Sequence, residues 1–174
     1  ELRRNVTSNG IANVHIHQIA LGDTDSDMQF YSSESTEVSS FIAGHYASVN
    51  KLVRTVHVNN GDQYLQQQNV SHVDFIKLDV EGYEDAVLRG LAKTIMRDQP
   101  VLWMEWIESI RKEFAKPEQQ LPIPTGYRAY GFAYNKPRWL FFNDPVVRLV
   151  SLGPTYRKRN ILLLPQRIWS SGQK

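Results

Sequence analysis

Three carboxylates and one lysine are the residues whose types and spacing point to chemistry. Asp79 and Glu81 end one apolar run of the chain, and Glu105 stands toward the end of the next. Lys77, Asp79 and Glu81 alternate along the sequence, so an extended backbone directs their side chains to one face. Such a face can hold a cation or orient hydroxyl groups, and a carboxylate beside a hydroxyl can act as a general base. The alternative is structural, with Asp79 capping a following helix and Lys77 neutralising Glu81 or Glu105.

The segments around these residues predict a parallel strand–helix–strand unit. Residues 73–80 form a nearly continuous apolar run, which is typical of a strand buried on both faces. A turn is expected at 81–82, and apolar residues at every fourth position predict one helix over 83–95. Residues 101–107 predict a second core strand. In open sheets of this kind, ligands bind outside the carboxyl ends of the strands, where the three carboxylates stand.

Outside this unit, the hydrophobic pattern predicts further elements of a single domain that spans residues 1–174. No internal repeat is visible. The expected elements are the tail of a helix at 1–9, a strand at 14–21, a long irregular connection at 22–50, a strand at 53–58, a helix at 63–68, a short helix at 108–116, and hairpin-like strands at 127–134, 138–142 and 160–164. A connection as long as the one at 22–50 often covers a site.

The composition is that of an ordinary globular protein. The 174 residues carry a net charge of +2 and no long basic run, which gives no support for nucleic-acid binding. The absence of cysteine excludes disulfides, thiolate zinc sites and a cysteine nucleophile. The five histidines have no spacing that forms a metal set with a carboxylate, so we assign no metal site. No apolar run approaches the ~20 residues of a membrane span, and we expect a soluble, cytoplasmic protein.

Other catalytic and binding motifs are missing or weak. The sequence has no Gly-x-Ser-x-Gly elbow, and the glycine spacing at 126–131 is followed by Phe132 where a phosphate loop requires lysine. These absences argue against hydrolase and nucleotide-triphosphate functions. The aromatic residues Trp103, Trp106, Tyr134 and Trp139 leave open a carbohydrate-binding module, which is the weaker interpretation because most of them fall on predicted core strands.

The segment that contains the carboxylates resembles a known enzyme family. The matching strings are VDFIKLDVEGYE at 73–84, VLRG at 87–90 and PVLWME at 100–105, with a weaker match upstream at 19–23. Together they resemble the signature of the FkbM family of S-adenosylmethionine-dependent methyltransferases. The resemblance implies a Rossmann-like class I methyltransferase sheet, mostly parallel with an antiparallel carboxyl-terminal edge. It also implies O-methylation of a hydroxyl, often on a sugar or a polyketide.

For such a reaction, the carboxylates are the candidate catalytic residues. Asp79 and Glu105 are candidates for the base or the hydroxyl-orienting group, and Glu81 for an orienting or metal-binding role. Lys77 either keeps Glu105 ionised or is a buried ion-pair partner.

The cofactor side of the predicted site is less complete. Ala20 and Leu21 follow the third strand of the family, near where such folds contact adenine, and their backbone amides can bind it. Ordinary packing at a strand end is the alternative, and Asp79 is also assigned to the cofactor. The family's glycine-rich turn, which holds the methionine and ribose of S-adenosylmethionine, has no counterpart, because no two of the ten glycines are separated by a single residue.

We therefore expect an α/β methyltransferase-type domain, truncated at its amino terminus, that lacks the first two strands of the family's sheet. Its expected function is S-adenosylmethionine-dependent O-methylation of a hydroxyl on a sugar or glycan. The missing strands would leave buried backbone groups unpaired at about 1–3 kcal/mol each, and the exposed edge can promote self-association. The alternative is a non-catalytic binding or assembly module that keeps the sheet and uses the carboxylates structurally.

Overall fold

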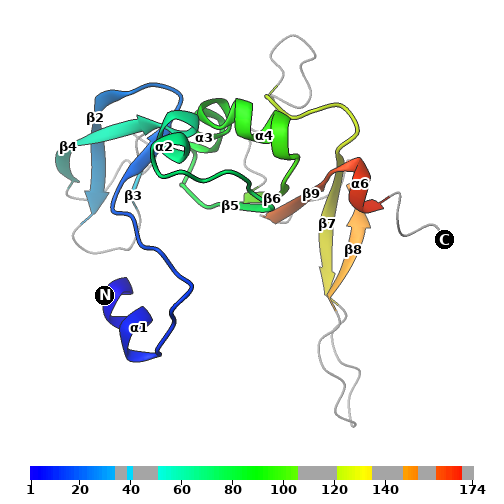
Figure 1. The fold of residues 1–174 in the computed structure, drawn as a ribbon, viewed down its shortest axis with the longest axis horizontal. Helices are drawn as coiled ribbons and strands as arrows, with labels where there is room; N and C mark the ends of the chain where they lie inside the picture. Colours follow the sequence, from blue (N-terminus) through cyan, green and yellow to red (C-terminus); the bar gives the residue numbers. More distant parts are fainter. Residues whose placement is uncertain (34–38, 41–50, 106–120, 135–146, 153–159, 170–174) are drawn as a thin grey trace.

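The computed structural model describes residues 1–33, 39–40, 51–105, 121–134, 147–152 and 160–169 (Figure 1). The helices are α1 (Leu2–Ser8), α2 (Gly61–Gln67), α3 (Glu84–Gly90), α4 (Ala92–Asp98) and α6 (Gln166–Trp169). The strands are β1 (Ala20–Gly22), β2 (Ser26–Ser33), β3 (Ser39–Ser40), β4 (Lys51–Asn60), β5 (Phe75–Leu78), β6 (Val101–Glu105), β7 (Arg128–Tyr134), β8 (Val147–Ser151) and β9 (Asn160–Leu164). The helix expected at 108–116 and the strand expected at 138–142 lie outside the described residues.

The strands form two sheets, so the fold is mixed α/β. One sheet has the strand order β1-β4-β2-β3, and the other has the order β5-β6-β9-β7-β8. Among the described strands, only the β1–β4 and β5–β6 pairs are parallel. The described residues therefore do not form a single, mostly parallel sheet. The expected antiparallel carboxyl-terminal edge is present in β9, β7 and β8.

The predicted strand–helix–strand unit is present, with one correction to its helix. The apolar pattern predicted one helix, but α3 and α4 are separate and meet at Leu91. Asp62 of α2 accepts the backbone N–H groups of Lys93 and Thr94 at 2.8 and 2.9 Å. These amides would bond to α3 carbonyls in a continuous helix, so the carboxylate caps a new helix in place of that continuation.

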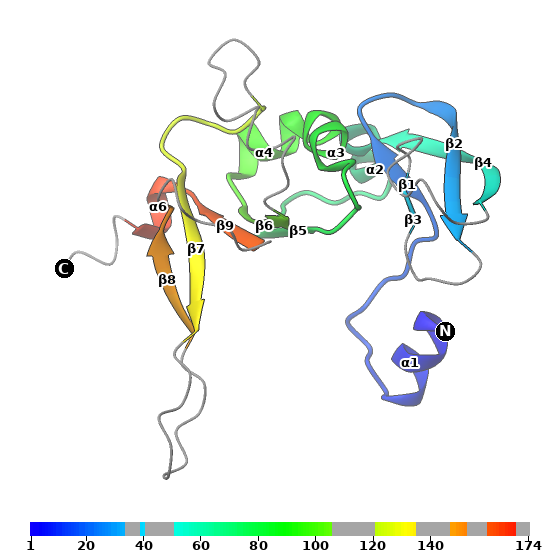
Figure 2. The same ribbon diagram turned by 180° about the vertical axis from the view of Figure 1, so that it is seen from behind.

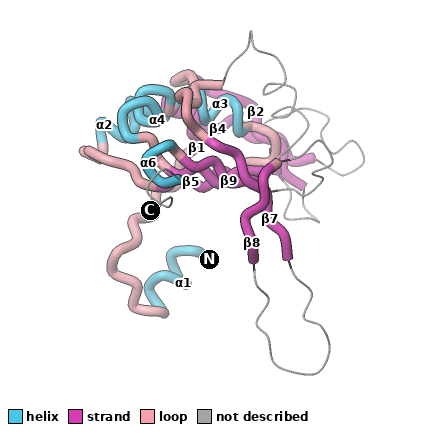
Figure 3. Tube along the Cα trace, turned by 90° about the vertical axis from the view of Figure 1, so that its right-hand side faces the viewer, coloured by secondary structure: helices cyan, strands magenta, loops and turns pink. Residues whose placement is uncertain are grey.

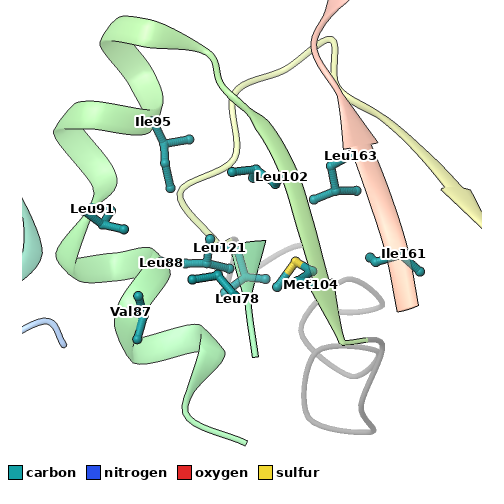
Figure 4. Packing of buried hydrophobic residues seen from close by; sticks show 10 residues of the cluster. All are labelled: Leu78, Val87, Leu88, Leu91, Ile95, Leu102, Met104, Leu121, Ile161 and Leu163. Atoms are coloured by element: carbon teal, nitrogen blue, oxygen red, sulfur yellow. The ribbon is translucent and has the colours of Figure 1, made fainter. Parts of the chain in front are cut away.

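The core lies between the α3–α4 pair and strands β5, β6 and β9 (Figure 4). Its ten clustered apolar residues are Leu78, Val87, Leu88, Leu91, Ile95, Leu102, Met104, Leu121, Ile161 and Leu163. Their spacing of three or four along the helices and two along β6 and β9 places them on one face of each element. Truncating a fully buried leucine of such a cluster to alanine costs about 2–5 kcal/mol.

The amino-terminal half departs most from the sequence predictions. The strand expected at 14–21 is limited to β1 at its end, and Val14 is 44% exposed. The connection expected at 22–50 contains β2, which pairs with β4 in antiparallel register along its eight residues. Met28 and Phe30 alternate with polar residues in β2, a two-residue period that the Ser- and Asp-rich composition obscured.

β5 is not buried on both faces, as its apolar run had predicted. Among the described strands it is the end strand of its sheet, and it pairs with β6 on one side. Phe75 is consequently 49% exposed, and Lys77 is exposed as well.

Two glycines allow α3 to pack directly on β1. A Cβ atom added to Gly90 would lie 1.7 Å from the carbonyl oxygen of Gly22, so Gly90 accepts no side chain unless the backbone moves. Because α3 also covers the five-stranded sheet, this contact joins the two sheets.

Two parts of the chain lie at the periphery. α1 has no buried residue and lies apart from both sheets (Figure 2). The β7–β8 pair projects away from the layer of helices (Figure 3). None of the helices in the described part of the chain combines the length and the apolar character that crossing a bilayer requires.

Candidate functional site

A cavity of about 1230 Å³ is lined by both end strands, β1 of one sheet and β5 of the other. Its walls also include the segment before β1, parts of β2, β4 and α2, the turn after β5, and the start of α3. The site residues expected from the sequence that line this cavity are Ala20, Leu21, Lys77, Asp79 and Glu81. The structure therefore brings five of the six together.

The β5 wall carries a close ion pair. Nζ of Lys77 lies 2.6 Å from Oδ2 of Asp79, and both side chains are about half exposed. Screening by water makes such a pair worth only about 0–1 kcal/mol. Lys77 thus neutralises Asp79. The N-cap position of α3 is Tyr83, whose side chain makes no capping hydrogen bond.

The turn after β5 holds Glu81 in an uncommon backbone conformation. Glu81 has φ of +49° and Gly82 has φ of +97°. Glycine tolerates this left-handed region, whereas a residue with a Cβ atom is strained there. The conformation of Glu81 must therefore be held by its surroundings.

Glu105 is the expected site residue that does not line the cavity. It ends β6, and Leu78 pairs with Met104, so β5 stands between β6 and the cavity. The charge of Glu105 acts instead on Glu84, the first residue of α3, which is 0% exposed. Burial raises the pKa of Glu84, and the nearby charge of Glu105 raises it further.

The β1 wall supplies apolar surface and backbone groups. Ala20 and Leu21 pair in parallel with Val58 and Asn59 of β4. The side-chain amide of Asn59 donates a hydrogen bond to the carbonyl oxygen of Ala20 at 3.3 Å and also lines the cavity. The wall thus combines apolar side chains with a fixed amide group.

Several cavity residues were not identified from the sequence. Nδ1 of His17 lies 2.7 Å from the hydroxyl of Tyr64. The two ring nitrogens of His57 lie 3.1 Å from Asp25 and 2.9 Å from Asp27. The hydrogen bond to Asp27 and the charge of Asp25 raise the pKa of His57. Sequence spacing gave no signal for these contacts, because they join segments that meet only through β2–β4 pairing or through α2.

Two further sequence hypotheses concern metals and aromatic residues. Within the described ranges, no group of three or more histidine or acidic side chains could hold a metal ion. The ring of Trp103 packs against Phe132, with centroids 5.4 Å apart, while Trp106 and Trp139 lie outside the described residues. The carbohydrate-binding hypothesis therefore gains no support from Trp103.

Comparison with protein families gives a match over most of the chain. The model of the methyltransferase FkbM domain matches residues 1–134. No curated protein and no solved structure matches the chain.

Proposed function

Because the chain belongs to the FkbM methyltransferase domain family, we propose that it is an S-adenosylmethionine-dependent O-methyltransferase acting on a hydroxyl of a sugar or glycan. One observation carries this proposal. The turn that follows β5 lies in the matched region, and it forms a wall of the large cavity together with β1. The cavity is larger than the about 300–1,000 Å³ typical of small-ligand pockets, which leaves room for a donor and an acceptor.

The proposal extends to the fold. β1 and β5 are the strands that the resemblance places on either side of two further strands of a Rossmann-like sheet. Each is the end strand of its own sheet, and both line the same cavity. This arrangement is the one expected of a methyltransferase sheet without those two strands.

The cavity walls fit the cofactor at its adenosyl and sulfonium parts. Ala20 and Leu21 offer apolar surface for an adenine ring, and Asn59 offers a fixed amide beside them. Asp79 and Glu81 supply carboxylates that attract a positively charged sulfur and can accept hydrogen bonds from ribose hydroxyls. The glycine-rich cradle for the methionine end has no counterpart in the sequence.

In the proposed reaction, the protein acts mainly by orientation. When bound, S-adenosylmethionine supplies an electrophilic methyl group, and holding a hydroxyl in line with it can contribute about 7–11 kcal/mol. Asp79 accepts the proton of the acceptor hydroxyl as general base, a role worth about 10²–10⁴-fold in rate. Lys77 holds the Asp79 carboxylate in place, and Glu81 orients the acceptor from the turn. Glu105 is assigned no role in the reaction, because it does not line the cavity.

A transfer assay tests this function. The chain is incubated with S-adenosylmethionine carrying a labelled methyl group and with sugars that bear free hydroxyls. We expect labelled product from wild type and a loss of about 10²-fold or more in Asp79→Asn. Asp85→Asn removes a carboxylate outside the cavity lining and should retain the wild-type rate. Equal rates for wild type and Asp79→Asn would refute the role of Asp79.

A second candidate function rests on the end strands themselves. β1 and β5 each have a described partner strand on one side only, and Phe75 on β5 is 49% exposed. Such edges can accept a strand from another chain, including a second copy. Concentration-dependent association in sedimentation, without any binding of S-adenosylmethionine, would favour this assembly function over catalysis. A monomer at all concentrations would exclude self-association.

A further inference from the structure

The buried carboxyl group of Glu84 has no role in the proposed reaction. Its side chain is 0% exposed at the first residue of α3. Oε1 accepts a hydrogen bond from the backbone N–H of Val80 at 3.3 Å, and Oε2 has no hydrogen-bond partner among the described residues. Burying a carboxyl group costs free energy unless hydrogen bonds replace those it made to water. The hydrogen-bond partners of Glu84 therefore indicate the role of its carboxyl group.

Those contacts are with the turn that forms the cavity wall. Burial is the largest influence on the pKa of Glu84 and raises it, whereas the nearby backbone N–H groups of Glu84 itself, Val80 and Gly82 lower it. Backbone N–H groups that converge in a turn form a concavity that binds anions. In this chain the anion is the carboxylate of Glu84.

The same turn contains a strained residue. Glu81 lies between Val80 and Gly82, with φ of +49°. A non-glycine residue persists in this region only where its surroundings hold it. The Glu84 carboxylate accepts the N–H of Val80 and lies near the N–H of Gly82, so it constrains the turn on both sides of Glu81.

We propose that Glu84 is a positioning residue, whose carboxylate holds the turn of residues 80–82 so that Asp79 and Glu81 face the cavity. The inference rests on the proposed function for the use of those two carboxylates. Whether Glu84 holds the turn does not depend on a bound cofactor or substrate. The positioning role of Glu84 and the proposed function can therefore be tested separately.

Three variants distinguish positioning from general stability. Glu84→Gln keeps the size and one acceptor oxygen but removes the titrating group, and Glu84→Ala removes the acceptors altogether. Asp85→Asn is the matched control, because Asp85 is the next residue of α3 and pairs with Arg89 at 2.6 Å, away from the turn. The charge that acts on Glu84 from a neighbouring element is that of Glu105 on β6, and Glu81 lies in the turn itself.

The first readout is the pH dependence of the backbone amide NMR shifts of Val80 and Gly82. In wild type and Asp85→Asn, we expect both amides to titrate together, with an apparent pKa above that of an ordinary glutamate. In Glu84→Gln this titration should disappear, although Glu81 and Glu105 remain. Persistence of the titration in Glu84→Gln, or its absence in wild type, would overturn the proposal.

The second readout is the affinity for S-adenosylmethionine, measured by calorimetry below the unfolding temperature of every variant. We expect Glu84→Ala to bind at least about 10-fold more weakly than wild type, and Glu84→Gln to recover most of this loss. Equal affinity of wild type and a folded Glu84→Ala variant would overturn the proposal. Absence of binding by wild type would refute the proposed function alone, because the amide titration would still decide whether Glu84 holds the turn.

Discussion

Replacing Asp62 with alanine tests why the chain forms two helices where its apolar pattern predicts one. The carboxylate accepts the backbone N–H of Lys93 at 2.8 Å, the N–H of Thr94 at 2.9 Å and the Thr94 hydroxyl at 2.6 Å. Thr94 is buried. In the alanine variant, its two donors therefore lose their acceptor in a place that water reaches poorly.

The expected loss of stability follows from these contacts. Loss of a helix cap costs about 1 kcal/mol, and leaving a buried donor unpaired costs about 1–3 kcal/mol. Together we expect Asp62→Ala to lower the free energy of unfolding by about 2–4 kcal/mol. A domain of this size loses about 2–4 °C in Tm for each kcal/mol, so Tm should fall by about 4–16 °C.

Thermal and urea unfolding, followed by circular dichroism, measure this loss. Thr94→Val removes the hydroxyl donor on the other side of the contact. The double variant Asp62→Ala with Thr94→Val should lose at least about 0.5 kcal/mol less than the sum of the two single variants. A Tm within about 1 °C of wild type, or strict additivity, would refute the idea that Asp62 caps α4.

Three further predictions concern packing and pH. Gly90→Ala should destabilise the chain by about 1–3 kcal/mol, because the added Cβ would lie 1.7 Å from the Gly22 carbonyl oxygen. An unchanged urea midpoint would contradict this. The adjacent Arg97 guanidinium holds the pKa of Asp98 at about 2, below the ordinary value of 3.8. The stability that Asp98 contributes is therefore full above pH 3.8 and is lost as pH falls toward 2. Asp98→Asn should weaken the dependence of the free energy of unfolding on pH in this acid range, and an unchanged dependence would disprove the assignment. The raised pKa of His57 means that its contribution to β2–β4 pairing is full below pH 6.5 and is lost as pH rises through the folded-state pKa. Hydrogen exchange of the β2 amides in wild type and His57→Gln checks this, and identical pH profiles would count against it.

The central unit of the fold could be predicted from the sequence because local patterns determine it. The apolar runs at β5 and β6, the Glu81-Gly82 turn and the four-residue period of the helices are each local, and all are present in the structure. The break between α3 and α4 could not be predicted, because it depends on Asp62, about 30 residues upstream. β2 was missed because its alternation is short and most of its residues are polar, while its register is set by the long strand β4.

The sequence placed Lys77, Asp79 and Glu81 together, and they line one cavity. The predicted reason was wrong in part, because β5 ends at Leu78 and Glu81 lies in a left-handed turn instead of an extended strand. Glu105 was expected beside them because it ends the neighbouring strand, but β5 is the end strand of its sheet, and the cavity lies on the side away from β6. Glu84 lies at the start of the predicted helix, where its sequence position gives no sign of a role, and only its burial and its hydrogen bond to the turn distinguish it.

The central claim is that the wall formed by Asp79 and Glu81 binds the methyl donor. Isothermal titration of S-adenosylmethionine into wild type, into the double variant Asp79→Asn with Glu81→Gln, and into Asp85→Asn tests it most directly. The account predicts saturable binding to one site in wild type and Asp85→Asn, and binding weakened by at least about 10-fold, or 1.4 kcal/mol, in the double variant. Equal affinity in all three proteins, or no binding to wild type, would contradict it.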